Sequence, residues 1–250
     1  MSPASNFLLV IPARCESQRL PAFLKELVEA LREAPFTTRL QIVDDGSPEA
    51  EVLALKTALA SLQSHPAVQL DPLLEQPTPL GKGSAIQTGW ATATCERWLG
   101  FVDADGAVPP REVRETLEII FHHPDPPDVF LAIREAKSCP VSRSKLRHLA
   151  SRAFAFYAKC ILGMPFYDPQ CGFKVLQRSI WFSLQPPCQE DGFCFDLELL
   201  FRSKQAGACF EEIPIEWIAQ PGGPFCPWRD GIMMLRRVYA LRAKLRSRSA

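Results

Sequence analysis

The sequence predicts an α/β protein, with a doubly wound and mostly parallel sheet flanked by helices in a single domain over residues 1–250. Two observations lead to this prediction. Short apolar runs typical of buried strands alternate with segments whose apolar residues recur at helical spacing. Acidic residues directly follow two of these runs, as expected at the carboxyl ends of parallel strands, where open α/β sheets place their ligands. A chain of 250 residues is long enough to bury one full core.

The alternation of strands and helices is clearest in the first half of the chain. Helical spacing is visible, for example, in Leu24, Leu27 and Leu31. We expect strands over residues 6–11, 39–43, 67–70 and 99–102, and helices over residues 20–33, 49–64 and 84–94. This order predicts parallel strands joined by right-handed crossovers.

The second half is less regular. We expect strands over residues 129–133, 173–176 and 210–217, helices over 145–162, 195–205 and 230–245, and a loop over 220–227. Pro214 places its strand at an edge of the sheet, because proline cannot donate a hydrogen bond to a neighbouring strand. The last helix is basic and amphipathic, and its apolar face fits either a membrane surface or packing on the domain. That face consists of Leu235, Val238, Leu241 and Leu245.

The composition excludes several classes of function. Lys and Arg number 28, as do Asp and Glu, whereas a nucleic-acid-binding protein needs a basic surplus. The nine cysteines form no C-x-x-C pair, so neither a disulfide framework nor a zinc site is expected, and a reducing compartment is indicated. The sequence has no apolar run of about 18 residues, so we expect no transmembrane helix. We therefore expect a cytoplasmic protein, or one peripheral to the cytoplasmic face of a membrane.

Two carboxylates one residue apart follow the apolar run 98–102. Asp103 and Asp105 are expected on the same side of the local backbone, because side chains alternate along an extended chain. One or two protein carboxylates commonly hold Mg²⁺ or Mn²⁺ while substrate phosphates complete the coordination. The pattern therefore predicts a divalent-metal site. A surface turn is the alternative, since Asp and Gly are also favoured in turns.

Three further polar segments are candidates for ligand contacts. Asp44 and Asp45 follow a predicted strand and could accept hydrogen bonds from a nucleoside, or cap the next helix. Residues 81–84 (GKGS) open a helix whose N–H groups and dipole favour an anion, although the spacing is not that of a P-loop. Residues 168–174 (DPQCGFK) interrupt an apolar region, as expected where a backbone passes close to a ligand. Cys171 within them is expected to be packed rather than nucleophilic.

Six motifs in order resemble those of inverting glycosyltransferase family 2. Within the family, they are most similar to the branch of dolichyl-phosphate β-glucosyltransferases and other polyprenyl-phosphate glycosyltransferases. The resemblance extends from about residue 7 to about residue 241. The motifs are Val10-Ile11-Pro12-Ala13 with Glu16, Val43-Asp44-Asp45-Gly46-Ser47, Gly81-Lys82-Gly83, Asp103-Ala104-Asp105-Gly106, Asp168-Pro169-Gln170-Cys171-Gly172-Phe173-Lys174 and Phe195-Asp196-Leu197-Glu198-Leu199-Leu200.

The resemblance implies a GT-A fold. Residues from about 6 to 110 would bind a nucleotide-sugar, those from about 128 to 228 the acceptor, and a basic helix would follow over about 229–250. Asp105 would hold Mg²⁺ or Mn²⁺ on the donor diphosphate, and Asp103 would face the ribose or the metal. The metal would stabilise the nucleoside diphosphate as it leaves. The residues implied in the donor pocket are Pro12, Ala13, Glu16, Asp44, Asp45, Lys82 and Asp103.

The resemblance also implies transfer of a hexose, with inversion, from a nucleotide-sugar such as UDP-glucose to a polyprenyl or dolichyl phosphate at a membrane surface. Arg134, with Arg143 or Arg147, would bind the acceptor phosphate, because guanidinium binds phosphate in a bidentate manner. A soluble hydroxyl acceptor is the alternative, and it would need a carboxylate base such as Asp168 or Asp196. A nucleotide-sugar-binding protein without catalysis is the third interpretation, and the intact pair of metal-binding carboxylates argues against it.

Overall fold

The protein is described by a computed structural model that covers residues 6–62, 65–134, 166–185, 187–218 and 238–243, together with residues 157, 161, 163, 164, 220 and 236. The strands are β1 (Phe7–Ala13), β2 (Thr38–Asp44), β3 (Val68–Leu70), β4 (Leu74–Glu75), β5 (Trp98–Val102), β6 (Val129–Arg134), β7 (Phe173–Gln177) and β8 (Phe210–Ile215). The helices are α1 (Leu20–Arg32), α2 (Glu49–Ala60), α3 (Lys82–Trp90), α4 (Pro110–His122), α6 (Arg178–Ser183) and α7 (Phe195–Gln205).

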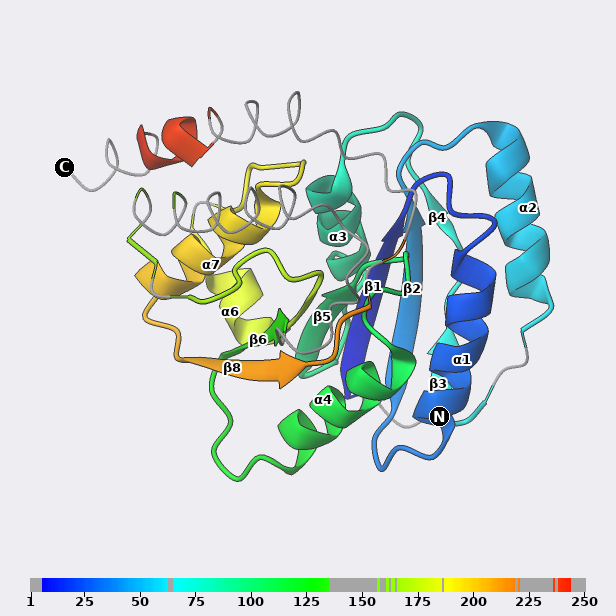
Figure 1. Ribbon diagram of the computed structural model, residues 1–250, viewed down its shortest axis with the longest axis horizontal. Helices are drawn as coiled ribbons and strands as arrows, with labels where there is room; N and C mark the ends of the chain where they lie inside the picture. Colours follow the sequence, from blue (N-terminus) through cyan, green and yellow to red (C-terminus); the bar gives the residue numbers. More distant parts are fainter. Residues whose placement is uncertain are drawn as a thin grey trace.

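The described strands form one mixed, mostly parallel sheet with helices on both faces, which confirms the expected fold class (Figure 1). The strand order is β3-β2-β1-β5-β7-β6-β8, and β4 also pairs with β2. β1 runs parallel to β2 and β5, and β6 runs parallel to β8. β8 ends this order, as Pro214 predicts. β7 runs antiparallel to both β5 and β6, so Val102 pairs with Phe173 and the loop before β7 meets the loop after β5.

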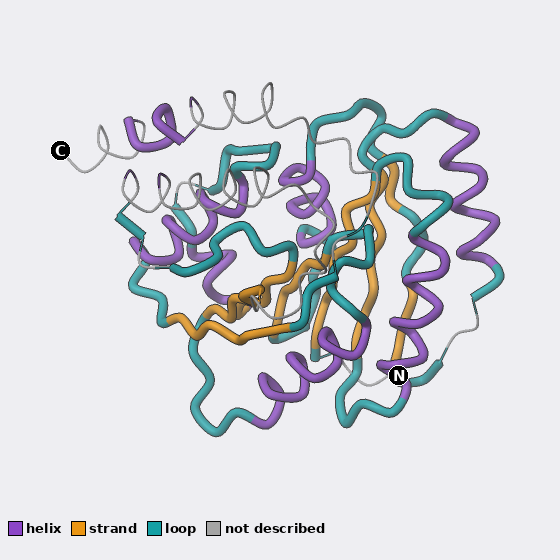
Figure 2. The backbone as a smooth tube through the Cα atoms, in the orientation of Figure 1, coloured by secondary structure: helices purple, strands orange, loops and turns teal. Residues whose placement is uncertain are grey.

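Side chains along β1 alternate between two hydrophobic cores. Phe7, Leu9 and Ile11 face the core formed with α1, α2 and α4, whereas Leu8 and Val10 face the core formed with α3, α6 and α7. The helices accordingly lie on both sides of the central strands (Figures 1 and 2). Because both faces of the sheet are covered, its central strands are apolar on both sides, as is usual for parallel sheets.

Several elements differ from those expected. No element was predicted over residues 110–122, where α4 buries Val113, Leu117 and Ile120. The short elements α6 and β4 were not predicted either. α3 ends at Trp90 and not at residue 94. Arg143, Arg147, most of the helix expected over 145–162 and nearly all of the loop expected over 220–227 lie outside the described residues.

The described part of the C-terminal helix packs on the domain. Residues 236 and 238–243 are helical. Val238 is 0% exposed and Leu241 2% exposed, and both belong to the core formed with α3 and α7, whereas Tyr239 is 64% exposed. The apolar positions at 238 and 241 are therefore covered by protein, which favours packing on the domain over insertion of this face into a membrane. Within the described part of the chain, the helices are too short or too polar to cross a bilayer.

Leu241→Ala is expected to lower the free energy of unfolding by about 2–4 kcal/mol, because it removes a buried side chain and leaves a cavity. Tyr239→Ala, on the exposed side of the same helix, is the matched control and should change it by about 0.5 kcal/mol or less. Urea unfolding followed by circular dichroism measures both. Equal, small effects would contradict the packing of this helix on the domain.

Candidate functional site

The side chain of Asp103 occupies space beside Gly172 that a larger residue at position 172 would fill. Asp103 directly follows β5, and its backbone N–H donates to the carbonyl oxygen of Gly172 at 2.9 Å. A Cβ on Gly172 would lie 2.1 Å from Oδ2 of Asp103. The glycine in segment 168–174 therefore makes room for a carboxylate of the protein itself. The Asp103 side chain remains 36% exposed, which leaves it accessible to a ligand.

A chain of alternating charges leads from Asp103 into the protein interior. Nζ of Lys82 lies 2.8 Å from Oδ1 of Asp103 and 3.6 Å from Oδ2 of Asp196. Nζ of Lys174 lies 2.6 Å from Oδ1 of Asp196 and donates to the carbonyl oxygen of Cys171 at 2.7 Å. The structure thus brings together three residues predicted for the site, Asp103, Lys82 and Asp196, and adds Lys174.

Lys82 and Asp196 are held in their charged forms by their partners, whereas burial raises the pKa of Asp103 and the charge of Lys82 offsets only part of that rise. Burial alone would raise the pKa of Asp196, but Lys174 and Lys82 outweigh it and hold that pKa below its ordinary value. Burial would likewise lower the pKa of Lys82, but the carboxylates of Asp103 and Asp196 raise it well above the ordinary value. Buried charges are tolerated when they are paired in this way.

Asp105 lies in the turn after Asp103 and near a third carboxylate. Its Oδ1 accepts the N–H of Ala107 at 3.0 Å, so the turn interpretation and the metal interpretation apply to the same residue. Burial raises the pKa of Glu16, and the charges of Asp105 and Asp103 raise it further. Arg19 partly offsets this effect through a hydrogen bond from its Nε to Glu16 at 2.7 Å. The carboxylates of Glu16, Asp103 and Asp105 therefore repel one another, and a bound divalent cation would reduce this repulsion.

The carboxylate oxygens fit Mg²⁺ or Mn²⁺, which prefer hard oxygen ligands. Among the described residues, no group of three or more His, Cys, Asp or Glu side chains is arranged to hold a metal ion. One or two carboxylates are enough when a diphosphate supplies the remaining oxygens. The residues present are therefore compatible with a metal that binds together with its nucleotide.

Asp44 and Asp45, at the end of β2, both bind the backbone. Asp44 accepts the N–H of Ser47 at 2.8 Å. Asp45 accepts the N–H groups of Leu80 and Gly81 at 2.7 and 2.9 Å, so its carboxylate fixes the approach to α3. Asp44 and Asp45 are 2% and 5% exposed, respectively. The structure gives both residues a role within the protein, and their contact with a nucleoside stays a prediction.

Protein acceptors bind two of the N–H groups at the start of α3. The N–H of Ser84 donates to the carbonyl oxygen of Asp191 at 3.0 Å, and a Cβ on Gly81 would lie 2.4 Å from the same oxygen. The loop carrying Asp191 is held in turn by Glu198, which accepts the N–H groups of residues 189 and 190, each at 2.7 Å. The N–H groups of Gly81 and Ser84, which were predicted to favour an anion, are thus bound by acceptors of the protein itself.

The loop after β1 is hydrogen-bonded to the loop after β2. Pro12 and Ala13 end β1, where Ala13 pairs with Asp44. Cys15 adopts a φ of 54°, unusual for a residue with a side chain, and its N–H donates to Oγ of Ser47 at 2.9 Å. The predicted donor-pocket residues of these two loops are therefore neighbours.

Arg134 and Asp168 form a bidentate pair on the other side of the site. Nε and Nη2 of Arg134 donate to Oδ2 and Oδ1 of Asp168 at 2.6 and 2.8 Å. Burial would lower the pKa of Arg134, but Asp168, with a smaller effect from Asp103, raises it well above the ordinary value. The guanidinium also lies 5.3 Å from the ring centre of Trp217. Asp168 thus occupies the Nε–Nη2 edge of the guanidinium, one of its two edges that can bind a carboxylate or phosphate in a bidentate manner.

Cys171 has no properties of a nucleophile. Its thiol is buried, and burial together with the charge of Asp168 raises the pKa to about 12. The thiol is therefore neutral near pH 7, as expected of a packed cysteine.

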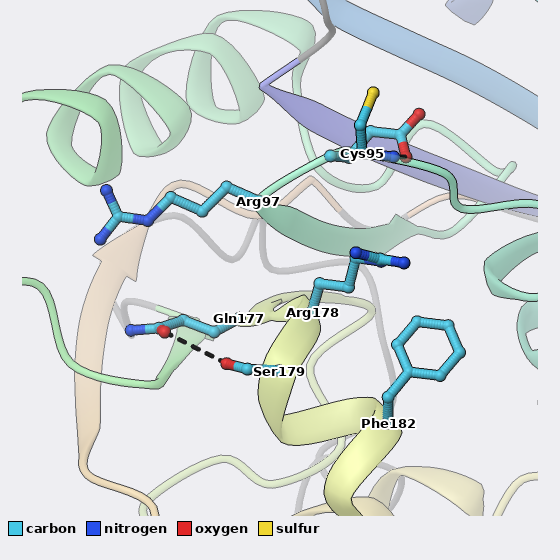
Figure 3. Close-up of a pocket in the computed structure, with 7 residues that line it drawn as sticks. Cys95, Arg97, Gln177, Arg178, Ser179 and Phe182 are labelled. Carbon is cyan, nitrogen blue, oxygen red and sulfur yellow. Dashed lines mark hydrogen bonds between the residues drawn. The ribbon is translucent and has the colours of Figure 1, made fainter.

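A pocket of about 390 Å³ lies elsewhere on the molecule. Its lining comes from residues 95–97, before β5, and from residues 177–179 and Phe182, at the end of β7 and in α6 (Figure 3). It therefore lies at the amino end of β5, whereas Asp103 follows the carboxyl end. The charged pairs around Asp103, and not this pocket, define the candidate site.

Gly172 and Lys174 belong to one of the six motifs, but neither was predicted to lie in the site. Lys174 is 1% exposed in a mostly apolar strand. A lysine inside a buried strand requires a buried partner, because an unpaired charge is unfavourable there. That signal was available from the sequence, but the identity of the partner was not.

The order of the strands in the sheet is that of the GT-A fold. The chain belongs to glycosyl transferase family 2, whose family model matches residues 8–181.

Relatives and solved structures agree with this assignment. The dolichyl-phosphate β-glucosyltransferases of Drosophila melanogaster and Homo sapiens are each 28% identical to the chain. The matches cover 96% and 97% of the chain and 75% and 76% of the relatives, respectively. Glucosyl-3-phosphoglycerate synthase of Mycobacterium tuberculosis, crystallised with Mn²⁺, UDP-glucose and phosphoglyceric acid, shares the fold. Its TM-score is 0.62 at 16% identity, over 95% of this chain and 78% of that one.

Gly172→Ala is expected to lower the free energy of unfolding by about 1–3 kcal/mol, the usual effect of overpacking, because the new methyl group must displace the Asp103 carboxylate. In an Asp103→Ala background the same change should cost much less, since the three atoms nearest to the added Cβ all belong to Asp103. Urea unfolding of the four proteins gives the coupling energy. Equal costs in both backgrounds would show that Gly172 does not make room for Asp103.

Proposed function

We propose that the protein transfers a hexose, with inversion, from a nucleotide-sugar to a polyprenyl or dolichyl phosphate, and that the donor is UDP-glucose. The observation that carries the proposal is the placement of Asp103 and Asp105 after β5, with Lys82 held against Asp103. The names of the relatives described above support a lipid-phosphate acceptor.

Asp105 and Asp103 would hold a Mg²⁺ or Mn²⁺ ion. When bound, the metal would neutralise charge on the donor diphosphate and so favour its departure. Lys82 adds a fixed positive charge beside Asp103, and its raised pKa keeps it charged across the physiological range. Positive charge placed in advance where negative charge develops lowers the barrier to transfer.

The first half of the chain would bind the donor. The loops after β1 and β2, tied together by Cys15 and Ser47, would hold the nucleoside, and the charged edge at Asp103 would hold the diphosphate. The residues proposed for the donor pocket are Pro12, Ala13, Glu16, Asp44, Asp45, Lys82 and Asp103. Asp44 and Asp45 would contribute mainly by fixing these loops, because their carboxylates already bind backbone N–H groups.

The state of the remaining carboxylates supports a phosphate acceptor. Asp196 is shared by two lysines, and Asp168 is paired with Arg134, so both candidate bases are already engaged in ion pairs. A hydroxyl acceptor would need a base, whereas a phosphate is already an anion. In the proposed role, Asp168 orients Arg134 toward the acceptor phosphate, with Arg143 and Arg147 as further candidates outside the described residues.

The transfer reaction itself tests the proposal. Purified protein with Mn²⁺ should move glucose from labelled UDP-glucose to dolichyl phosphate, and GDP-mannose should be the poorer donor. Asp105→Asn should reduce turnover by about 100-fold or more, as loss of a charge-stabilising group does. Its melting temperature should stay close to that of the wild type, and Asp125→Asn, at an exposed position, is the matched control.

A preference for GDP-mannose would show that UDP-glucose is not the donor. Transfer only to a soluble hydroxyl compound would overturn the proposed lipid-phosphate acceptor. Full turnover by Asp105→Asn would contradict the metal site.

Arg134→Lys is expected to raise KM for dolichyl phosphate by about tenfold or more while leaving the affinity for the donor nearly unchanged, because lysine cannot keep the bidentate pair with Asp168. Arg97→Lys, at the amino end of β5, is the control. Steady-state kinetics with each substrate varied in turn separates the two effects. An unchanged acceptor KM and kcat would remove Arg134 from the acceptor site.

A further inference from the structure

Lys174 is a buried charge that the proposed reaction does not use directly. It lies on β7, is 1% exposed, and its Nζ contacts Asp196 and the carbonyl oxygen of Cys171. No atom of Asp103 or Asp105 is among these contacts. Since a buried lysine is unfavourable unless its charge serves a pair, its position calls for an explanation beyond packing.

The distances show how the pairing of Lys174 with Asp196 affects Lys82. Asp196 offers one oxygen to each lysine, at 2.6 Å to Lys174 and 3.6 Å to Lys82. Lys82 in turn lies closer to Asp103, at 2.8 Å, than to Asp196. Asp196 therefore binds Lys174 tightly and Lys82 loosely, which leaves the Lys82 ammonium directed toward Asp103.

An aromatic ring lies beside Lys82. Its Nζ lies 4.8 Å from the ring centre of Phe101, and Nζ of Lys174 lies 5.4 Å from the same ring. The aromatic ring thus lies beside both ammonium groups. Among the described residues, the carboxylates that pair with Lys82 are those of Asp103 and Asp196.

We propose that Lys174 is a positioning residue of the donor site: by occupying Asp196, it directs Lys82 to Asp103. Without Lys174, Asp196 would draw Lys82 inward and Asp103 would lose its partner. The consequence for donor binding rests on the proposed function, whereas the effect on Lys82 does not.

The test compares a single with a double substitution. Lys174→Met leaves Asp196 with Lys82 as its remaining lysine partner, so the affinity for UDP in the presence of Mn²⁺, measured by calorimetry, should fall by about tenfold. Lys174→Met/Asp196→Asn removes the competing charge as well, and should restore the affinity to within about threefold of the wild type. Lys204→Met, near the end of α7, is the matched control. Lys174→Gln replaces Lys174→Met if the latter does not fold.

A second measurement, made without ligand, follows the position of the Lys82 ammonium group directly. The side-chain ammonium resonance of Lys82, observed by ¹⁵N nuclear magnetic resonance, should shift in Lys174→Met and return toward its original position in the double variant. An unchanged Lys82 resonance in the single variant would overturn the proposal. So would a double variant that binds UDP as weakly as the single one, since Lys174 would then act directly on the ligand or on packing alone. If the wild-type protein does not bind UDP, the proposed donor fails, and the resonance of Lys82 still decides the role of Lys174.

Discussion

The reversed direction of β7 is the constraint on which the candidate site depends. Because β7 runs antiparallel to β5, the chain that enters β7 meets the chain that leaves β5, and Val102 pairs with Phe173. The same few residues then supply both the backbone space beside Asp103 and the lysine that binds Asp196. A parallel β7 would have carried that segment to the opposite end of the sheet, and the charges around Asp103 would lack their inner partners.

The charges of the site are held by strands and helices more than by free loops. Lys82 begins α3, Asp196 lies in the first turn of α7, and Lys174 lies within β7. Each side chain is therefore fixed by an element that also contributes to a hydrophobic core. This arrangement suits chemistry that needs charge placed in advance, because little reorganisation is then needed when the substrate binds.

Much of the architecture could be predicted from the sequence, and the remainder has physical reasons. Alternating apolar runs and helical spacing identified most strands and helices, and Pro214 identified an edge strand. The direction of β7 could not be predicted, since a run of five mostly apolar residues is compatible with either direction. The carboxylates after β5 were found by their spacing, but the partners of Asp103 and Asp168 depend on contacts between distant segments. Helix α4 was overlooked although its apolar residues have helical spacing.

The hydrogen bonds at the start of α3 have a consequence for how the molecule fluctuates. Asp191, held through its loop by Glu198, accepts the N–H of Ser84, while Asp45 accepts the N–H of Gly81. The bond from Ser84 to Asp191 joins the N-terminal and C-terminal parts of the chain, and the bond from Gly81 to Asp45 fixes the N-terminal part beside it. Local opening of one part would break contacts of the other, so we expect amide hydrogens on both sides to exchange as one cooperative unit. The beginning of α3 then acts as a joint between the two halves and not as a boundary between separate modules.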